Sequence, residues 1–357
     1  MDLGNTSARG TIAVPRHPRA ATALRSIIAE IGQRSGEFPV FLANHLPMVL
    51  EAMGRLGAAP ERLAEYAEHY DRVHAVPALP PPVAPLTADT WRTALGDRSR
   101  ETDLRDFFAE EVSQRGGVET IRLYLPTLFP GVAASATHGL MRLAYALLRR
   151  DETEIGISLG YWAATYLAFP IRLGGASPTT DPLVPVLAMR GEPSFSGIVL
   201  PSTLLWKFIE HMGTLPAFQA QLGRLVPTPA LLDELRQLSL TLYAATRSFE
   251  ALHAVTGCHW LRLVAPTLDR PEILVAHWWE VVMSLYAKIG MPELPNAATI
   301  AAWRALPVPP DTDIAAAAIA SDDEHDHSLV FSAFEEFKLT GDPLYKVVAA
   351  RRIGLIA

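Results

Sequence analysis

The chain has 357 residues, of which 49% are hydrophobic and 19% charged, so it can bury the core of one large domain or two ordinary ones. Its formal net charge of −7 argues against a nucleic-acid partner, because such partners need a basic face. No run of eighteen uncharged apolar residues occurs, so no membrane span is expected. A single cysteine, Cys258, excludes an internal disulfide and favours a reducing cytoplasm, as does the lack of a signal-peptide pattern.

In the N-terminal half, the sequence predicts helices that are separated by glycine and proline residues. Residues 1–19 lack periodicity and predict a flexible tail. The prolines of residues 76–87 predict a stiff extended connector. Helices are expected over residues 20–33, 38–56, 61–73, 87–95 and 103–113, and the second of them carries His45. Shorter helical pieces continue to residue 128, and a further helix with His138 follows Pro130.

The C-terminal half continues this pattern around one interruption. Crowded glycines and prolines predict a long irregular loop over residues 170–201. Ser321 and Glu324 have the spacing of a capping box for the helix that bears His325. Other helices are expected over residues 152–169, 203–212, between about 229 and 268, and over 271–290, 296–306, 313–319 and, after the turn at 341–343, up to about 352.

Alternating strand patterns are nearly absent along the chain. We therefore predict an all-α fold, with residues 20–357 forming one large helical domain of helix–turn–helix pairs around a central pocket.

Four histidines occupy similar places, near the start or in the middle of apolar helices: His45, His138, His253 and His325. A buried imidazole needs a hydrogen bond or a metal ion, because burying an unpartnered polar group is costly. One interpretation is four separate core histidines that bond to carbonyls or carboxylates. The other, on which we build, is one metal ion held by four neutral imidazoles, a ligand set that suits iron, zinc, copper or nickel.

Further polar residues lie close to these four in the sequence. His259 follows His253 by six residues and points about 120° away from it on a helix, so we expect it beside the site, with His253 and His259 as catalytic groups. The acidic run Asp322, Asp323 and Glu324 either caps the helix or supplies a carboxylate that orients a histidine.

Other motifs indicate little chemistry. Residues 156–160 spell G-x-S-x-G, but that hydrolase motif needs a preceding strand and here lies in a predicted helix. No dinucleotide fingerprint, Walker motif or H-E-x-x-H motif occurs, so no residue is assigned to a nucleotide cofactor. Five tryptophans either line an aromatic pocket or pack in the core: Trp162, Trp206, Trp260, Trp278 and Trp279.

Several segments together resemble the questin oxidase-like family. They are NHLPM at 44–48, the turn at 56–58, residues 61–63 leading to Tyr70, THGL at 137–140, the aromatics at 161, 162 and 166, LHAVTG at 252–257 and DDEH at 322–325. The resemblance extends over residues 38–350. It implies an oxygenase that uses O₂ to open a ring of an anthraquinone-like polyketide, or to oxidise it in a Baeyer–Villiger-type reaction, with either a histidine-bound non-haem iron or NADPH. The absence of a dinucleotide fingerprint favours iron.

The resemblance also implies a lysine three residues after the last histidine, where this chain has Ser328. We expect water to fill that ligand position, ahead of Lys346 and then His327, which points about 160° away from His325. Two alternatives remain open: an NADPH-dependent, metal-free oxidase that uses the histidines as acid and base, and a non-catalytic helical ligand-binding protein.

Overall fold

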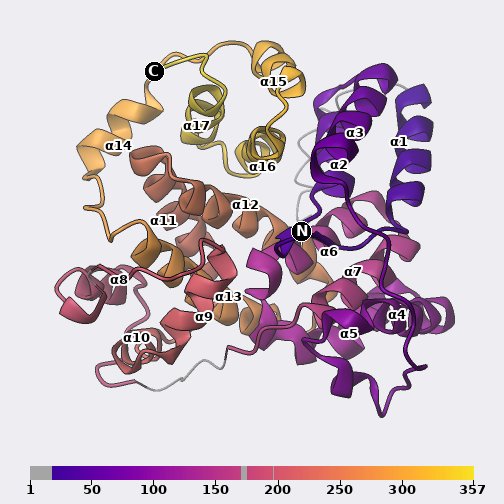
Figure 1. The fold of residues 1–357 in the computed structure, drawn as a ribbon. Coiled ribbons are helices and arrows are strands. Elements are labelled where there is room, and N and C mark those ends of the chain that lie inside the picture. Colours follow the sequence, from indigo (N-terminus) through magenta and orange to yellow (C-terminus); the bar gives the residue numbers. More distant parts are fainter. Residues whose placement is uncertain (1–17, 170–174, 196) are drawn as a thin grey trace, which may run out of the picture.

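A computed structural model describes residues 18–169, 175–195 and 197–357 as a helical assembly with one short hairpin (Figure 1). Its named strands, within these residues, are β1 (Glu37–Phe38) and β2 (Leu42–Ala43), which pair antiparallel. The prediction of an all-α fold is confirmed. The predicted tail at residues 1–19 lies outside the described residues except for its last two, which already belong to the first helix.

The helices follow one another with short connections. In the first half they are α1 (Pro18–Ile31), α2 (Leu46–Leu56), α3 (Pro60–His74), α4 (Glu101–Arg115), α5 (Gly117–Leu128), α6 (His138–Arg149) and α7 (Glu152–Ala164). In the second half they are α8 (Leu183–Met189), α9 (Leu205–Thr214), α10 (Pro216–Leu222), α11 (Leu231–Thr246), α12 (Phe249–Val264), α13 (Pro271–Lys288), α14 (Ala297–Arg304), α15 (Asp311–Ala320), α16 (Glu324–Thr340) and α17 (Leu344–Arg352). Short 3₁₀ helices are η1 (Trp91–Ala94), η2 (Arg98–Arg100), η3 (Phe129–Gly131), η4 (Ala134–Thr137), η5 (Pro193–Phe195) and η6 (Ala265–Thr267). No helix of the described residues is long and apolar enough to cross a membrane.

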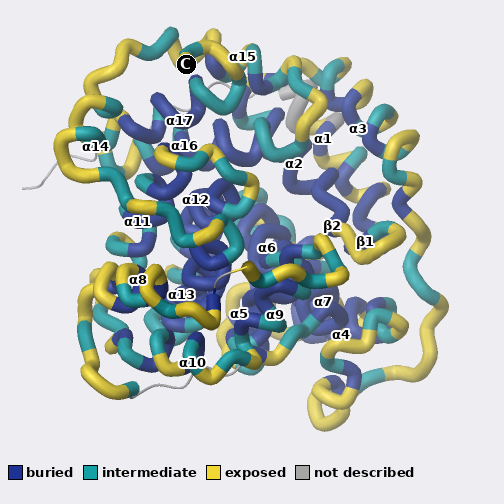
Figure 2. Tube along the Cα trace, turned by 60° about the vertical axis from the view of Figure 1, so that its left-hand side comes forward, coloured by how far each residue is buried: buried dark blue, intermediate teal, exposed yellow. Residues whose placement is uncertain are grey.

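Helix α12 is the centre of the packing, and Figure 2 colours most of it as buried. It begins at the N-cap Ser248, whose hydroxyl accepts a hydrogen bond from the Ala251 N–H. It packs against α6, α11, α13 and α16. Helix α16 also packs against α2, and α2 packs against α6, so α2, α6, α12 and α16 form one connected group of helices.

Helices α4 and α7 approach each other closely because two glycines of α7 face α4. A Cβ atom on Gly160 would lie 2.7 Å from the Cα atom of Arg105, and one on Gly156 would lie 3.2 Å from that of Ala109. Between them, the Ser158 hydroxyl donates a hydrogen bond to the Glu154 carbonyl of its own helix. The G-x-S-x-G sequence is therefore a helix-packing motif, as its predicted place in a helix indicates.

The helix predicted over residues 38–56 is wrong in its first part. The hairpin occupies residues 37–43, and Val40 and Phe41 adopt positive φ angles of 71° and 62°, which a helix excludes. Helix α2 then starts after His45, which is its N-cap residue, and has Pro47 in its first turn. The amide side chain of Asn44 accepts a hydrogen bond from the Leu46 N–H and fixes this start.

Four other predictions differ from the structure. The stretch at 170–201, predicted as irregular, contains α8, because Val186 and Met189 are buried against the core. The helix predicted over 87–95 is only η1, and the one predicted over 152–169 ends at Ala164. The N-cap of α16 is Asp323 rather than Ser321, since the Asp323 carboxylate accepts from the His325 N–H.

Candidate functional site

The four grouped histidines lie together, although they come from four helices. His45 precedes α2, His138 begins α6, His253 lies in the second turn of α12, and His325 is the second residue of α16. The ring centroids are 4.3 Å apart for His45 and His138, 5.3 Å for His45 and His325, 5.4 Å for His253 and His325, and 5.9 Å for His138 and His253. The geometric convergence expected from the sequence is therefore present.

Each of the four rings has its Nδ1 atom next to an oxygen. The partners are Ala43 O at 2.9 Å for His45, Ser135 O at 2.5 Å for His138, Phe249 O at 2.9 Å for His253 and Asp323 Oδ1 at 3.1 Å for His325. An oxygen acceptor at Nδ1 favours the tautomer that carries its proton there. In a neutral ring, Nε2 then has a free lone pair.

Two of these Nε2 atoms face each other. The distance between Nε2 of His45 and Nε2 of His138 is 2.6 Å, at which two lone pairs repel unless a proton lies between them. Two imidazole nitrogens bound to one tetrahedral ion would lie about 3.4 Å apart, so a metal ion could take the place of this proton once the two rings move apart slightly. The Nε2 atom of His325 is buried and has no hydrogen-bond partner among the described residues. Both observations fit a group of nitrogens that share a cation.

Burial keeps three of the four rings neutral, those of His45, His138 and His253. It lowers the pKa of His138 to about 4, and together with the neighbouring histidines it lowers the pKa values of His45 and His253 well below the ordinary value. A neutral imidazole is the form that binds a metal ion, so at pH 7 these rings are in the state a metal requires.

Glu324 joins the cluster and was not counted as part of a ligand set from the sequence. Its Oε1 atom lies 3.2 Å from Nδ1 of His45, and Glu324, His45 and His325 each offer a possible ligand atom within 4.8 Å of the others. Burial raises the pKa of Glu324 to about 7, against the opposing effects of His325 and of a hydrogen bond from Tyr70. The Tyr70 hydroxyl also accepts from the His45 N–H at 3.0 Å, so Tyr70 holds His45 and Glu324 together.

The position of Glu324 decides which function its carboxylate serves. It lies on the Nδ1 side of His45, where the proton is held, rather than on the Nε2 side that faces His138. We therefore interpret Glu324 as a carboxylate that orients His45, one of the two functions considered for the acidic run.

Asp323 both caps α16 and orients His325. Its Oδ1 atom accepts from the backbone N–H of His325 at 2.9 Å and lies 3.1 Å from the ring Nδ1. Arg352 pairs with Asp323 and with Asp326, each at 2.5 Å, and so anchors this turn from α17. The hydrogen bond from His325 lowers the pKa of Asp323 far below its usual range. The two interpretations of the acidic run, capping and orientation, thus hold together for this residue.

His259 does not lie beside the other four histidines, contrary to its predicted place. It is fully buried, with Nδ1 3.1 Å from the Glu336 carboxylate and 3.0 Å from the Arg262 guanidinium, and its ring contacts Phe331. The rotation of about 120° from His253 directs His259 toward α16, where Glu336 holds it.

The two predicted substitutes for the missing lysine also lie elsewhere. The ammonium of Lys346 is 2.8 Å from the Asp311 carboxylate and stands over the Phe337 ring. His327 is buried against the Tyr66 ring, at 5.0 Å between centroids. Lys346, His327 and Ser328 are not among the residues that line the cavity of the four histidines.

The four histidines line a cavity of about 310 Å³. Aromatic side chains form its wall: Phe38, Phe41, Trp206 and Phe249. The Arg98 guanidinium covers Phe41 and Trp206 at 5.0 and 5.2 Å, and is itself paired with Glu37. Of the five tryptophans considered, Trp206 lines this cavity and the other four are core residues.

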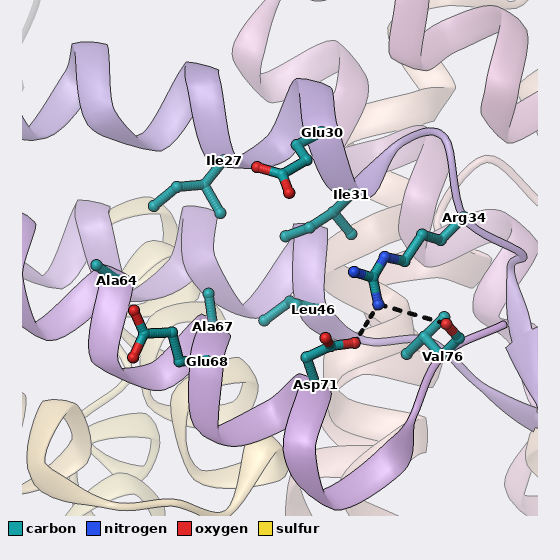
Figure 3. Close-up of a pocket in the computed structure, with 10 residues that line it drawn as sticks. All are labelled: Ile27, Glu30, Ile31, Arg34, Leu46, Ala64, Ala67, Glu68, Asp71 and Val76. Atoms are coloured by element: carbon teal, nitrogen blue, oxygen red, sulfur yellow. Dashed lines mark hydrogen bonds and ion pairs between the residues drawn. The ribbon is translucent and has the colours of Figure 1, made fainter. Parts of the chain in front are cut away.

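A second cavity of about 310 Å³ lies between α1 and α3 (Figure 3). Isoleucines of α1 face alanines of α3 across it, and Arg34 closes one end through hydrogen bonds to Asp71 and to the Val76 carbonyl. Leu46 lines it directly after His45, but no histidine does. This cavity therefore offers no set of ligands comparable to the four histidines.

Comparison with known proteins gives one family. No curated protein shows a significant match to the chain. Residues 42–189 match the model of a family described as questin oxidase-like, and this part includes His45 and His138. The match supports an oxidoreductase related to polyketide chemistry. The resemblance to the questin oxidase-like family is thus confirmed, over residues 42–189.

Proposed function

We propose that this protein is an oxygenase that binds a divalent metal ion, with iron as the favoured metal, through His45, His138, His253 and His325. The observation that carries the proposal is the oxygen partner at each Nδ1 atom, which leaves the four Nε2 atoms as donors. Two imidazoles bound to one tetrahedral ion, at metal–nitrogen distances of about 2.0–2.1 Å, have ring centroids about 5 Å apart. The four separations between ring centroids, from 4.3 to 5.9 Å, are close to this value, and binding would require Nε2 of His45 and Nε2 of His138 to move apart from 2.6 Å.

When bound, iron would supply the redox chemistry that lets O₂ react with an aromatic substrate. The chain's own residues supply binding and orientation. The aromatic wall of Phe38, Phe41, Trp206 and Phe249 fits a flat substrate, and the burial of three of the histidines limits the access of bulk water to their nitrogens. Tyr70 and Glu324 hold His45 in its position.

The substrate class that we propose is an aromatic polyketide, and two oxidations of it balance. In ring opening, both atoms of O₂ enter the product and no further reductant is needed. In a Baeyer–Villiger-type oxidation, one oxygen atom is inserted and the other becomes water, which requires two electrons from a donor such as NADPH. Ring opening therefore needs only the metal, whereas the Baeyer–Villiger-type oxidation also needs NADPH as a cosubstrate.

Metal analysis combined with oxygen uptake tests the proposal. We expect the purified protein, loaded anaerobically with Fe(II), to bind one ion per chain and to consume O₂ with a hydroxylated anthraquinone. Alanine at His45, His138, His253 or His325 should reduce both metal binding and oxygen uptake. His69→Ala on α3 should change neither metal binding nor oxygen uptake. Oxygen uptake that requires NADPH and persists without metal would favour the metal-free oxidase. Metal binding and substrate binding without uptake would favour a ligand-binding protein.

A further inference from the structure

Lys288 lies in the wall of the histidine cavity, and no carboxylate of the described residues forms an ion pair with it. It is the last residue of α13 and the one lysine or arginine that lines the cavity within the described residues. Its ammonium stands 4.8 Å from the centroid of the Phe208 ring. No carboxylate of a described residue lies within 4.0 Å of it, although Glu250 and Glu324 line the same cavity.

The other lysines of the chain are paired. Lys207 lies 2.9 Å from Glu210, Lys338 2.6 Å from Glu335 and Lys346 2.8 Å from Asp311. At the cavity rim, Arg98 is neutralised by Glu37 at 2.5 Å. Lys288 therefore differs from every other lysine, and it does so at the place where an aromatic wall would hold a ligand.

We propose that Lys288 binds an anionic oxygen of the substrate, so that the site selects flat aromatic compounds that carry a carboxylate or an ionised phenol. A half-buried ammonium gains a charge-assisted hydrogen bond when such an oxygen binds, and stays unpaired with a neutral analogue. Aromatic side chains of the same cavity, Phe38, Phe41, Trp206 and Phe249, can contact the ring system while Lys288 contacts the charged group. This inference rests on the proposed function in one respect, because it assumes that the substrate binds in the cavity of the four histidines.

Calorimetric titration with 2-naphthoate and with its neutral amide, 2-naphthamide, tests the inference on metal-loaded protein. We expect wild-type protein to bind the carboxylate more tightly, and Lys288→Met to weaken carboxylate binding about tenfold or more while leaving amide binding unchanged. Lys288→Arg should retain most of the preference. Lys207→Met is the matched control, because its ammonium lies 4.4 Å from the Trp206 ring but outside the cavity wall, and it should bind both probes as wild type does.

Several results would overturn the inference. These are equal binding of the two probes to wild type, no binding of either, or an equal loss of both in Lys288→Met. If His325→Ala abolished carboxylate binding and Lys288→Met did not affect it, the carboxylate would bind at the histidines and not at Lys288. Metal content of the same proteins separates the two proposals: a Lys288-dependent preference in protein that binds no metal refutes the metal centre alone, and metal binding without that preference refutes the Lys288 inference alone.

Discussion

At the residue scale, the chemistry of the cavity depends on which nitrogen of each histidine is free. Backbone carbonyls hold Nδ1 of His45, His138 and His253, and Asp323 holds that of His325. Glu324 follows Asp323 in the chain but acts on a different ring, that of His45. Two consecutive carboxylates thus fix two histidines from different helices, and neither occupies a free Nε2 atom.

The first prediction separates an orienting carboxylate from a metal ligand. Glu324→Gln should weaken metal binding by about tenfold, within the range found when an outer-shell partner is changed, because the four imidazoles remain. His325→Ala removes a donor nitrogen and should weaken it by much more. Metal affinity from competition with a chelator measures both variants. Equal losses in the two variants would show that Glu324 is itself a ligand.

The second prediction concerns the buried Glu336, which lies 3.1 Å from His259 and 2.6 Å from Arg262. Burial raises its pKa, but the hydrogen bonds from His259 and Arg262 outweigh burial and hold the pKa below the ordinary value. A carboxyl group with a depressed pKa in the folded state stabilises the protein above the unfolded-state pKa, near 4, and loses this effect as the pH falls through the folded value.

Glu336→Gln should therefore lower the free energy of unfolding at pH 7 by about 1–3 kcal/mol, and the difference from wild type should shrink as the pH falls below about 4. Denaturant unfolding at neutral and acid pH measures this. Glu335→Gln on the same helix, which loses a partly exposed pair with Lys338, should change the free energy by about 0.5 kcal/mol or less. A difference between Glu336→Gln and wild type that does not depend on pH contradicts the pKa argument.

At the scale of the secondary-structure elements, helix cores could be predicted and some helix starts could not. Periodic apolar residues indicated α3, α4 and α13 nearly to their ends. The hairpin at residues 37–43 gave no signal, because strands of two residues are too short to alternate and its positive φ angles fall on Val40 and Phe41 rather than on glycine.

The third prediction concerns the contact between α4 and α7. Gly160→Ala places a Cβ atom 2.7 Å from the Arg105 backbone, so the helices must move apart, and overpacking of this kind costs about 1–3 kcal/mol. We expect a lower thermal midpoint despite the better helix propensity of alanine. Gly191→Ala is the control, since a Cβ atom there meets nothing within 4 Å. A Gly160→Ala protein as stable as Gly191→Ala would refute the close approach.

At the scale of the whole molecule, the site connects helices that are far apart in the sequence, from α2 to α16 (Figure 1). The four histidines could be grouped from the sequence because each is near the start or in the middle of an apolar helix. The positions of His259, Lys346 and Glu324 could not be derived in the same way. They depend on how α12, α15 and α17 pack against α16, and on how α16 packs against α2, which no local pattern encodes.

The fourth prediction follows from this connection. An ion that binds the folded state alone stabilises it by about 4 kcal/mol when its free concentration is a thousand times the dissociation constant. We therefore expect a strong chelator to lower the thermal midpoint of metal-loaded wild type and to leave that of His325→Ala almost unchanged. Differential scanning calorimetry with and without chelator measures this. Equal chelator effects in both proteins would mean that the metal acts elsewhere.

X-ray absorption spectroscopy of the purified protein loaded with Fe(II) tests the central claim, the metal centre of four imidazoles, most directly. We predict one iron per chain, with imidazole nitrogens in its nearest shell at about 2.1 Å, and fewer of them when alanine replaces His45, His138, His253 or His325. His259→Ala should leave that shell unchanged, since His259 lies away from the cavity. Iron that fails to bind, or binds without imidazole scattering, would contradict the account.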